Sequence, residues 1–181
     1  MSATGRGAVR NERDFYATPL EAFIPILPII ACLPGPVWEP AAGDGRLVAE
    51  MWRHGIDAFG SDIHEAVAER RPVDFLDPRE HPCLVWPDSM YEPPRTIVTN
   101  PPFSLAMEFA RVAVANYNHV VLLLRLNFLA SQKRRDWFKA HPPSAIFVLS
   151  ERPSFTNNGK TDATDYAWIA WSSKLSGIHF L

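Results

Sequence analysis

Residues 100–103 read Asn-Pro-Pro-Phe and directly follow a short apolar segment at 96–99. Asn100 and Pro101 offer two hydrogen-bond acceptors, a side-chain amide oxygen and a backbone carbonyl oxygen, and Pro102 helps to fix the direction of that carbonyl. An amino group on an aromatic ring is a poor nucleophile, because its lone pair is delocalised into the ring. Two acceptors aimed at its hydrogens draw it toward tetrahedral geometry and stabilise the charge that develops. With Phe103 as a surface for stacking, the motif predicts a site that activates a ring amine; the alternative is a proline-rich loop leaving a strand.

A second motif, at residues 39–45, lies where an apolar segment gives way to a helical pattern. Its glycines let the backbone approach a ligand closely, and the helix that follows offers free N–H groups. It lacks the lysine of a P-loop, and its acidic first residue suits a neutral or cationic ligand better than a pyrophosphate. Asp62 follows about twenty positions later, where an acidic side chain can hold ribose hydroxyls. An ordinary tight turn, with Asp62 as a structural cap, is the alternative. The candidate ligand contacts in the motif are Glu39, Pro40, Ala41, Gly43 and Gly45.

Apolar and helical segments alternate along the chain, which predicts an α/β fold with a mostly parallel sheet. The continuous apolar run at 119–126 is typical of a central strand covered on both faces. The two last strands have no helical pattern between them, so we expect them to pair antiparallel. Ligands are expected at the carboxyl ends of the first and fourth strands, which carry the two motifs. The expected strands are 37–40, 58–63, 73–76, 96–99, 119–126, 145–150 and 166–171.

Helices are expected between these strands. Thr18 can cap a helix that begins at Pro19, and Ser104 can cap the helix that follows the Asn-Pro-Pro-Phe motif. Further helices are expected at 64–70 and, with a basic face, at about 131–140. The helix after residue 45 has an apolar face made of Leu47, Val48, Met51 and Trp52.

The composition is that of a globular protein, because 47% of the 181 residues are hydrophobic and 12% are aromatic. Residues 1–13 are expected to form a flexible tail before a single domain at 14–181. The formal net charge of −2 excludes a large basic surface, so a polyanion must bind a local patch. Prolines interrupt the apolar run at 23–33, which excludes a membrane span there. The lack of an apolar leader and the presence of only two cysteines predict a cytoplasmic protein.

Other catalytic chemistries find little support in the sequence. The six histidines are scattered without the spacing of a metal site, so no metal is expected. Cys83, after Pro82, invites comparison with thiolate attack on cytosine C5. It precedes rather than follows the fourth strand and lacks the companion Glu-Asn-Val motif, which favours an inert thiol.

Six basic residues are candidates for contact with nucleic acid. One follows the central strand, three lie in the basic helix and two flank the polar loop 154–165. The alternative is a solvated helix face and a loop without a binding role. The residues are Arg125, Lys133, Arg134, Arg135, Arg152 and Lys160.

In their order along the chain, the motifs resemble those of the S-adenosylmethionine-dependent DNA adenine N6-methyltransferases, particularly the small bacteriophage-type members. Residues 14–19 are similar to the N-terminal cofactor motif of that family, 39–45 to its glycine-rich cofactor motif and 100–103 to its catalytic motif. Residues 74–76 match the segment whose acidic side chain contacts the cofactor's adenine. Residues 152–155 and 166–168 also look like the corresponding segments of phage enzymes. The resemblance covers about residues 14–172. It implies a Rossmann-like class I methyltransferase fold, with a seven-stranded sheet whose last strand is antiparallel.

The resemblance implies that S-adenosylmethionine binds over the 39–45 turn and that a flipped adenine of DNA attacks its methyl group directly through N6. Asp62 would lie near the ribose of the cofactor and Asp74 near its adenine, although both can also be structural caps. The implied catalytic residues are Asn100, Pro101, Pro102 and Phe103. The implied cofactor contacts outside the turn are Tyr16, Thr18, Pro19, Asp62, Ile63, Asp74 and Phe75.

Other substrates stay open at this level. The Asn-Pro-Pro-aromatic motif also occurs in enzymes that modify guanine N2 in ribosomal RNA or glutamine in release factors, so RNA and protein glutamine are alternatives to DNA. A silent protein that binds a cofactor or a partner is the non-enzyme alternative, but such a role places no demand on the Asn-Pro-Pro-Phe side chains. No segment is long enough for a separate target-recognition domain. Loops 77–94 and 154–165, a homodimer or a partner subunit are therefore left to recognise the DNA sequence.

Overall fold

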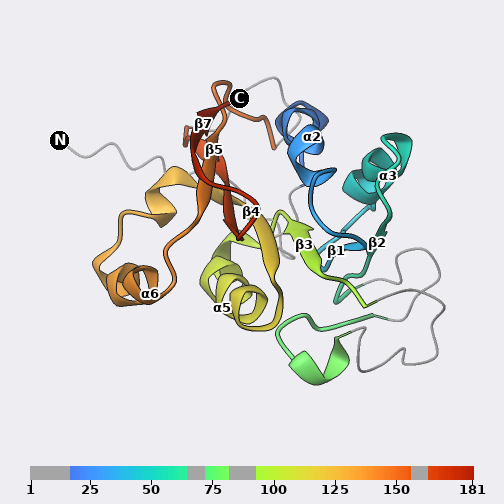
Figure 1. Ribbon diagram of the computed structural model, residues 1–181, viewed down its shortest axis with the longest axis horizontal. Helices are drawn as coiled ribbons and strands as arrows, with labels where there is room; N and C mark the ends of the chain where they lie inside the picture. Colours follow the sequence, from blue (N-terminus) through green and yellow to red (C-terminus); the bar gives the residue numbers. More distant parts are fainter. Residues whose placement is uncertain (1–16, 65–71, 82–92, 156–162) are drawn as a thin grey trace.

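The computed structural model describes residues 17–64, 72–81, 93–155 and 163–181. Seven strands form one sheet in the order β2-β1-β3-β4-β6-β5-β7 (Figure 1). The expected contacts Tyr16 and Lys160, the thiol Cys83 and residues 65–70 of an expected helix lie outside the described residues. The strands are β1 (Val37–Glu39), β2 (Ala58–Gly60), β3 (Thr96–Thr99), β4 (His119–Arg125), β5 (Ala145–Val148), β6 (Tyr166–Ser172) and β7 (Gly177–Phe180).

One strand of the sheet is reversed. β1 pairs in parallel with β2 and β3, and β3 pairs in parallel with β4. β6 is antiparallel to both of its neighbours, β4 and β5, whereas β7 is parallel to β5. The expected seven-stranded, mostly parallel α/β sheet is thus confirmed, as is the antiparallel pairing of the strands expected at 145–150 and 166–171. The antiparallel strand is the one that the sequence placed last, 166–171, but β7 follows it in the chain and is parallel to β5.

The expected strand at 73–76 is wrong. This segment forms a turn that leads into a short 3₁₀ helix, Pro78–Glu80. Carboxylates take the backbone N–H groups that a strand would use: Asp74 accepts from Leu76, and Glu80 accepts from Asp74. The seventh strand is instead β7, which no pattern predicted, and β3 is the third strand in chain order rather than the fourth.

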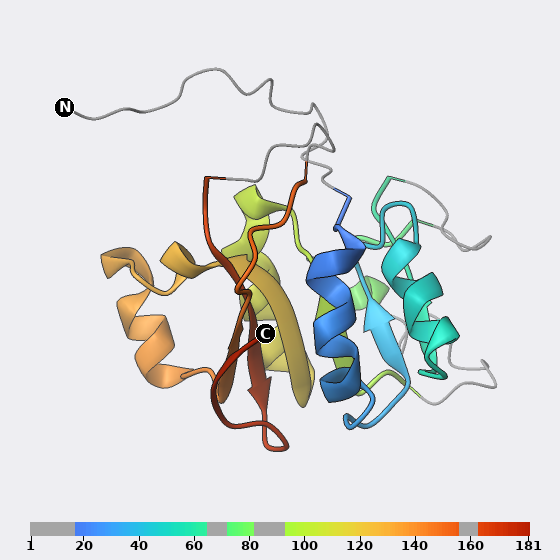
Figure 2. The same cartoon turned by 90° about the horizontal axis from the view of Figure 1, so that it is seen from above.

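Helices cover both faces of the sheet (Figures 1 and 2). The first face carries the helices before and after β1, and the second carries the helix between β3 and β4. Val121 and Leu123 of β4 point into the first core and Val120 and Leu122 into the second, all with 0% exposure. β4 is therefore the central, doubly covered strand that its sequence predicted. The helices are α1 (Leu20–Phe23), α2 (Leu27–Ile30), α3 (Arg46–Arg53), α5 (Ala106–Asn116) and α6 (Arg135–Ala140).

Three details of the expected helices are wrong. Pro19 is the N-cap residue of α1 rather than its first helical residue, and the Thr18 side chain does not cap it. Ser104 lies inside a 3₁₀ turn, Phe103–Leu105, so it does not cap α5. Trp52 is 55% exposed, because α3 lies over the edge strand β2, and the indole N–H donates to the Ala58 carbonyl.

Candidate active site

A cavity of about 260 Å³ opens at the carboxyl ends of β1, β2 and β3. Because these strands are parallel neighbours, the segments that leave them meet at one edge of the sheet. The cavity thus lies where the sequence predicted a ligand. Twelve of the expected site residues line the cavity: Thr18, Glu39, Pro40, Ala41, Asp62, Ile63, Asp74, Phe75, Asn100, Pro101, Pro102 and Phe103.

The glycine-rich turn is held by Asp62. Its carboxylate accepts the Gly43 N–H at 2.9 Å with one oxygen and the His64 N–H at 3.0 Å with the other. Gly43 and Gly45 have φ angles of 53° and 76°, which disfavour residues with a Cβ. These glycines are not among the residues that line the cavity; they shape the turn. Asp62 is thus a structural cap, but a carboxylate has about four lone-pair sites, so two bonds leave room for a ligand.

Glu39 is a buried acid, and one of its carboxyl oxygens, Oε2, has no hydrogen-bond partner among the described residues. Glu39 is the last residue of β1 and is 2% exposed. Burial raises the pKa of Glu39 well above its usual value, and the nearby carboxylates of Asp44 and Asp62 raise it further. A buried polar atom without a partner is destabilising by itself and is characteristic of a ligand site.

The cavity wall as a whole is acidic. Glu39, Asp44, Asp62 and Asp74 all line it, against a single arginine, Arg46. The Arg46 guanidinium is itself paired with Asp44 at 2.6 Å. The cavity therefore favours a ligand with positive charge.

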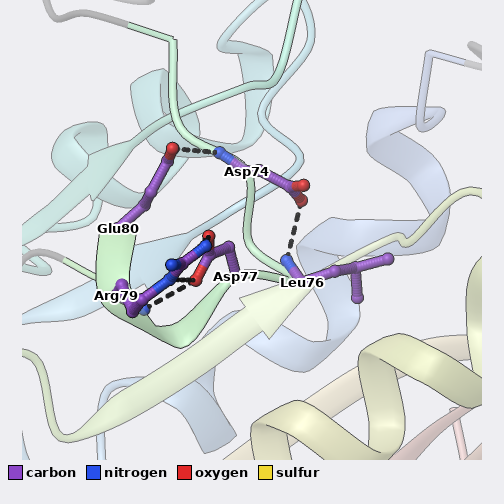
Figure 3. Close-up of polar contacts among 5 residues, drawn as sticks. All are labelled: Asp74, Leu76, Asp77, Arg79 and Glu80. Atoms are coloured by element: carbon purple, nitrogen blue, oxygen red, sulfur yellow. Dashed lines mark hydrogen bonds and ion pairs between the residues drawn. The ribbon is translucent and has the colours of Figure 1, made fainter.

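The segment 72–81 carries Asp74, which lines the cavity. Figure 3 shows the polar contacts of this segment. Asp74 receives the Leu76 N–H at 2.9 Å, while its own N–H donates to Glu80 at 2.9 Å. Asp77 pairs with Arg79 at 2.6 Å, and hydrogen bonds from Arg79 lower the pKa of Asp77 to about 2. The carboxylates of this loop thus fix its own backbone and hold the Asp74 side chain at the cavity wall.

A buried histidine, His81, stabilises the same loop. His81 is 2% exposed, and its Nε2 lies 2.8 Å from the Phe75 carbonyl oxygen. A carbonyl only accepts, so Nε2 carries the proton and Nδ1 accepts from the Tyr117 hydroxyl at 2.9 Å. Burial lowers the pKa of His81, which keeps the ring neutral. The imidazole stacks on the Phe75 ring at 5.2 Å and so holds Phe75 in place.

Apolar side chains form the rest of the wall. Ile63 and Leu105 line the cavity although they are 52% and 39% exposed, and Leu76 and Phe109 lie on the same wall. Exposed apolar side chains around a cavity suit a flat, apolar part of a ligand. Leu105, Leu76 and Phe109 were not among the predicted site residues, because helical or strand periodicity does not distinguish a cavity wall from a core.

The expected amine site lies beside this wall. Asn100 follows β3, and its Nδ2 donates to the Thr18 hydroxyl at 2.9 Å. Pro101 is buried and Pro102 half-buried, and both line the cavity. Asn100 and Pro101, which the sequence selected for their acceptor oxygens, therefore line the same cavity as the acidic residues.

Phe103 belongs to a group of four side chains that we call the aromatic cluster: Phe103, Arg125, Phe155 and Tyr166. The Phe103 ring lies 5.6 Å from Phe155 and 5.7 Å from Tyr166, and the Arg125 guanidinium lies over it at 4.7 Å. Arg125 also donates to the Tyr166 hydroxyl at 3.2 Å. One face of the expected stacking surface is thus covered by a cation. Phe155 and Tyr166 were absent from the predicted site residues, although both belong to segments that carry the family resemblance.

The other basic residues expected to contact nucleic acid differ in their contacts within the protein. Arg134 folds back, donating to the Phe128 carbonyl at 2.8 Å, and Arg152 pairs with Asp165 at 2.7 Å. Lys133 and Arg135 are exposed beside α6, and Arg135 lies 3.3 Å from the Asp136 carboxylate. Among the described members of this set, Arg125 contacts the Phe103 ring at the amine site.

The fold is shared with solved methyltransferase structures. The chain is similar to a protein assigned as the modification subunit of a type I restriction enzyme from Vibrio vulnificus, with a TM-score of 0.58 and 17% identity over 92% of this chain and 46% of that one. It is also similar to a protein assigned as a class I S-adenosylmethionine-dependent methyltransferase from Listeria monocytogenes, with a TM-score of 0.55 and 12% identity over 94% and 67% of the two chains. For the 23S rRNA methyltransferase ErmE, the TM-score is 0.51 and the identity 15% over 90% and 73%.

The chain has the class I methyltransferase fold. It spans about half the length of the restriction-enzyme subunit that it matches. The sequence matches no family model and no curated protein. In the part of the chain that the structure describes, no helix is long and apolar enough to cross a membrane, and no group of three or more His, Cys, Asp or Glu side chains is arranged to hold a metal ion.

Proposed function

We propose that this protein transfers a methyl group from S-adenosylmethionine to the exocyclic N6 of adenine in DNA. The observation that carries the proposal is the shared cavity: the acidic residues after β1 and β2 and the acceptors of Asn100 and Pro101 line the same space. The fold supports the reaction class, because the similar structures include methyltransferases of nucleic acid. The order of the motifs along the chain supports DNA as the substrate.

The residues of the cavity fit S-adenosylmethionine, which supplies a methyl group on a positively charged sulfur. The unmet Oε2 of Glu39 calls for a hydrogen-bond donor or a cation. Asp62 and Asp74 are the acceptors for the ribose hydroxyls and the adenine amino group. Ile63 and Leu105 are the apolar flanks for the adenine ring. Thr18, which lines the cavity, and its neighbour Pro19 are proposed to cover the methionine part, together with the glycine-rich turn.

In the proposed reaction, the protein holds the substrate amine and stabilises the positive charge that develops on its nitrogen. Asn100 Oδ1 and the Pro101 carbonyl accept the two hydrogens of the amine, so that its lone pair points away from the ring plane. Because two prolines follow Asn100, the backbone of this site is stiff before the substrate arrives. No covalent intermediate with the protein is needed, since positioning and charge stabilisation carry the rate.

Arg125 is the proposed first contact with the DNA backbone or with the flipped base. It lies on the Phe103 ring next to the acceptors, and a planar base that stacks on that face replaces the guanidinium. Lys133 and Arg135 are proposed phosphate contacts at greater distance, because they are exposed on the same chain segment that follows β4.

RNA is the competing substrate, and the similarity to ErmE favours it. Incubation of the protein with labelled cofactor and separately with DNA, RNA and protein tests both candidates. Digestion of the labelled nucleic acid to nucleosides, followed by mass spectrometry, reports the base and the atom. N6-methyladenine from DNA is the expected product. N6-methyladenine or N2-methylguanine from RNA alone would replace the proposal with its competitor, and transfer to none of these substrates would reject both.

A further inference from the structure

We infer that Thr18 is a positioning residue that fixes the side-chain amide of Asn100 with its oxygen turned toward the substrate amine. The inference rests on the proposed function for its catalytic meaning. It assigns to Thr18 a role other than helix capping or contact with the cofactor, and it links the segment before α1 to the amine site.

The contact is a single defined hydrogen bond between distant parts of the chain. Asn100 Nδ2 donates to Thr18 Oγ1 at 2.9 Å, across 82 positions of sequence. Thr18 is 5% exposed and Asn100 is half-buried, so water competes poorly for this bond. Thr18 also lines the cavity that contains Asn100.

The bond decides which end of the amide faces the cavity. An asparagine amide has an acceptor oxygen at one end and a donor NH₂ at the other, and a rotation of about 180° exchanges them. With Nδ2 engaged by Thr18, Oδ1 occupies the other position. In the reverse orientation the NH₂ would meet the hydrogens of an incoming amine, donor against donor. An amide held only by rotational preference would sample both states and lower the productive fraction.

Thr18 is itself held firmly. Pro19, its neighbour, restricts the backbone and forms the N-cap of α1. The helix is fixed to the sheet, because Trp168 Nε1 donates to the Ala22 carbonyl at 2.8 Å and the Trp168 ring contacts Phe23 at 5.6 Å. The Thr18 hydroxyl is therefore presented from a docked element rather than from a free segment.

A second contact ties the same residue to the glycine-rich turn. Arg46 Nη1 lies 3.5 Å from the Thr18 carbonyl oxygen, while the rest of the guanidinium binds Asp44. Thr18 thus stands between the acidic turn after β1 and the amide after β3. A hydroxyl has one proton to donate and two lone pairs, so acceptance from Asn100 is compatible with donation to a bound ligand.

Substitutions of Thr18 test the inference through turnover at saturating cofactor and DNA. Thr18→Val keeps the shape and removes the acceptor, and we expect kcat to fall about tenfold, the factor that corresponds to one lost hydrogen bond. Thr18→Ser keeps the hydroxyl, and we expect most of the rate to return. The matched control is Thr99→Val, because Thr99 is buried one residue before Asn100 and its hydroxyl has no partner among the described residues.

A double substitution identifies the route of the effect. If Thr18 acts through the amide, Thr18→Val should lower the rate no further in an Asn100→Ala background, measured in single turnovers. Additive losses would overturn the inference. So would a Thr18→Val protein with unchanged kcat and only a weaker affinity for the cofactor, since that pattern belongs to a contact with the cofactor.

A spectroscopic readout separates this inference from the proposed function. In protein labelled with ¹⁵N-asparagine, the side-chain NH₂ signals of Asn100 are identified by their loss in Asn100→Ala. We expect these signals to shift and to exchange faster with solvent in Thr18→Val but not in Thr99→Val. Unchanged signals would overturn the inference even in an active enzyme. Failure of every methyl-transfer assay would instead overturn the proposed function and leave the hydrogen bond testable.

Discussion

The two halves of the sheet differ in the side chains that they place at its carboxyl edge. β1 and β2, with the loop 72–81, contribute four carboxylates around one cavity: Glu39, Asp44, Asp62 and Asp74. On the other side lies the aromatic cluster, in which the Arg125 guanidinium lies over the Phe103 ring. Arg125 ends β4 and Tyr166 begins β6, while Phe103 and Phe155 come from the segments after β3 and β5. Asn100 follows β3, the strand between the two halves.

The proposed function gives the two halves ligands of opposite charge. Acidic walls attract a cation and repel phosphates, whereas an arginine over an aromatic ring suits a base carried on a phosphate backbone. Within the acidic half, Glu39 is buried with an oxygen that has no hydrogen-bond partner among the described residues, whereas both ring nitrogens of the buried His81 are engaged. A ligand is expected at Glu39, because its unpartnered oxygen belongs to a residue that lines the cavity, whereas Thr99, whose hydroxyl also lacks a partner among the described residues, does not line it.

The largest effect is expected at the boundary between the halves. Asn100→Ala should lower methyl transfer by roughly 10²–10³-fold, the loss typical of removing one preorganised polar group from a transition-state site. Its affinity for S-adenosylmethionine, measured by calorimetry, should stay within the range of the wild type. A variant that transfers methyl groups at the wild-type rate would remove Asn100 from the catalytic role.

The acidic half is tested next by Glu39→Gln. Loss of a buried charge that pairs with a cationic ligand should weaken cofactor binding about 10–100-fold, from the strength of hydrogen bonds to charged groups. Glu50→Gln is the matched control, because Glu50 is also buried but pairs with Arg53 and is not part of the cavity wall. Equal losses in the two variants would indicate general damage to the fold rather than a site.

Glu39 should also make the free protein less stable as the pH rises. Its pKa in the folded state lies above its value in the unfolded chain, so the folded state holds the proton more tightly between these two values. Stability is therefore expected to fall as the pH rises from about 4.5 through the folded pKa of Glu39. Glu39→Gln should remove this fall and be more stable at pH 7 by about 1 kcal/mol or more, as measured by thermal unfolding over a pH series. A wild-type stability that does not decline over this range would show that Glu39 is ionised in the folded state without penalty.

The smallest effect is expected at the aromatic half. Arg125→Ala should weaken binding to DNA severalfold and reduce the slope of log affinity against log salt by about one. Cofactor affinity should not change. Arg152→Ala serves as the comparison, since Arg152 is paired with Asp165 on the surface. A loss of cofactor binding in Arg125→Ala, with DNA binding intact, would remove the contrast between the two halves.

Short-range sequence patterns predicted much of the fold. The run of apolar residues in β4 predicted a central strand, and the missing helical pattern between β5 and β6 predicted their antiparallel pairing. The same reasoning failed at 73–76, where side-chain carboxylates bind the backbone N–H groups of their own loop. It also failed at β7, whose residues are all exposed and show no buried periodicity.

The sequence by itself determined which residues follow the carboxyl ends of the strands, because parallel strands with helical crossovers can align only in a few ways. That was enough to bring Glu39 and Asn100 to one cavity. Only the tertiary structure decided that an oxygen of Glu39 lacks a hydrogen-bond partner among the described residues and that Thr18 binds the Asn100 amide. It also decided that the rings of Phe155 and Tyr166 contact Phe103. These contacts join residues far apart in the chain, and local periodicity, which repeats every two or 3.6 residues, contains no information about which distant side chains meet.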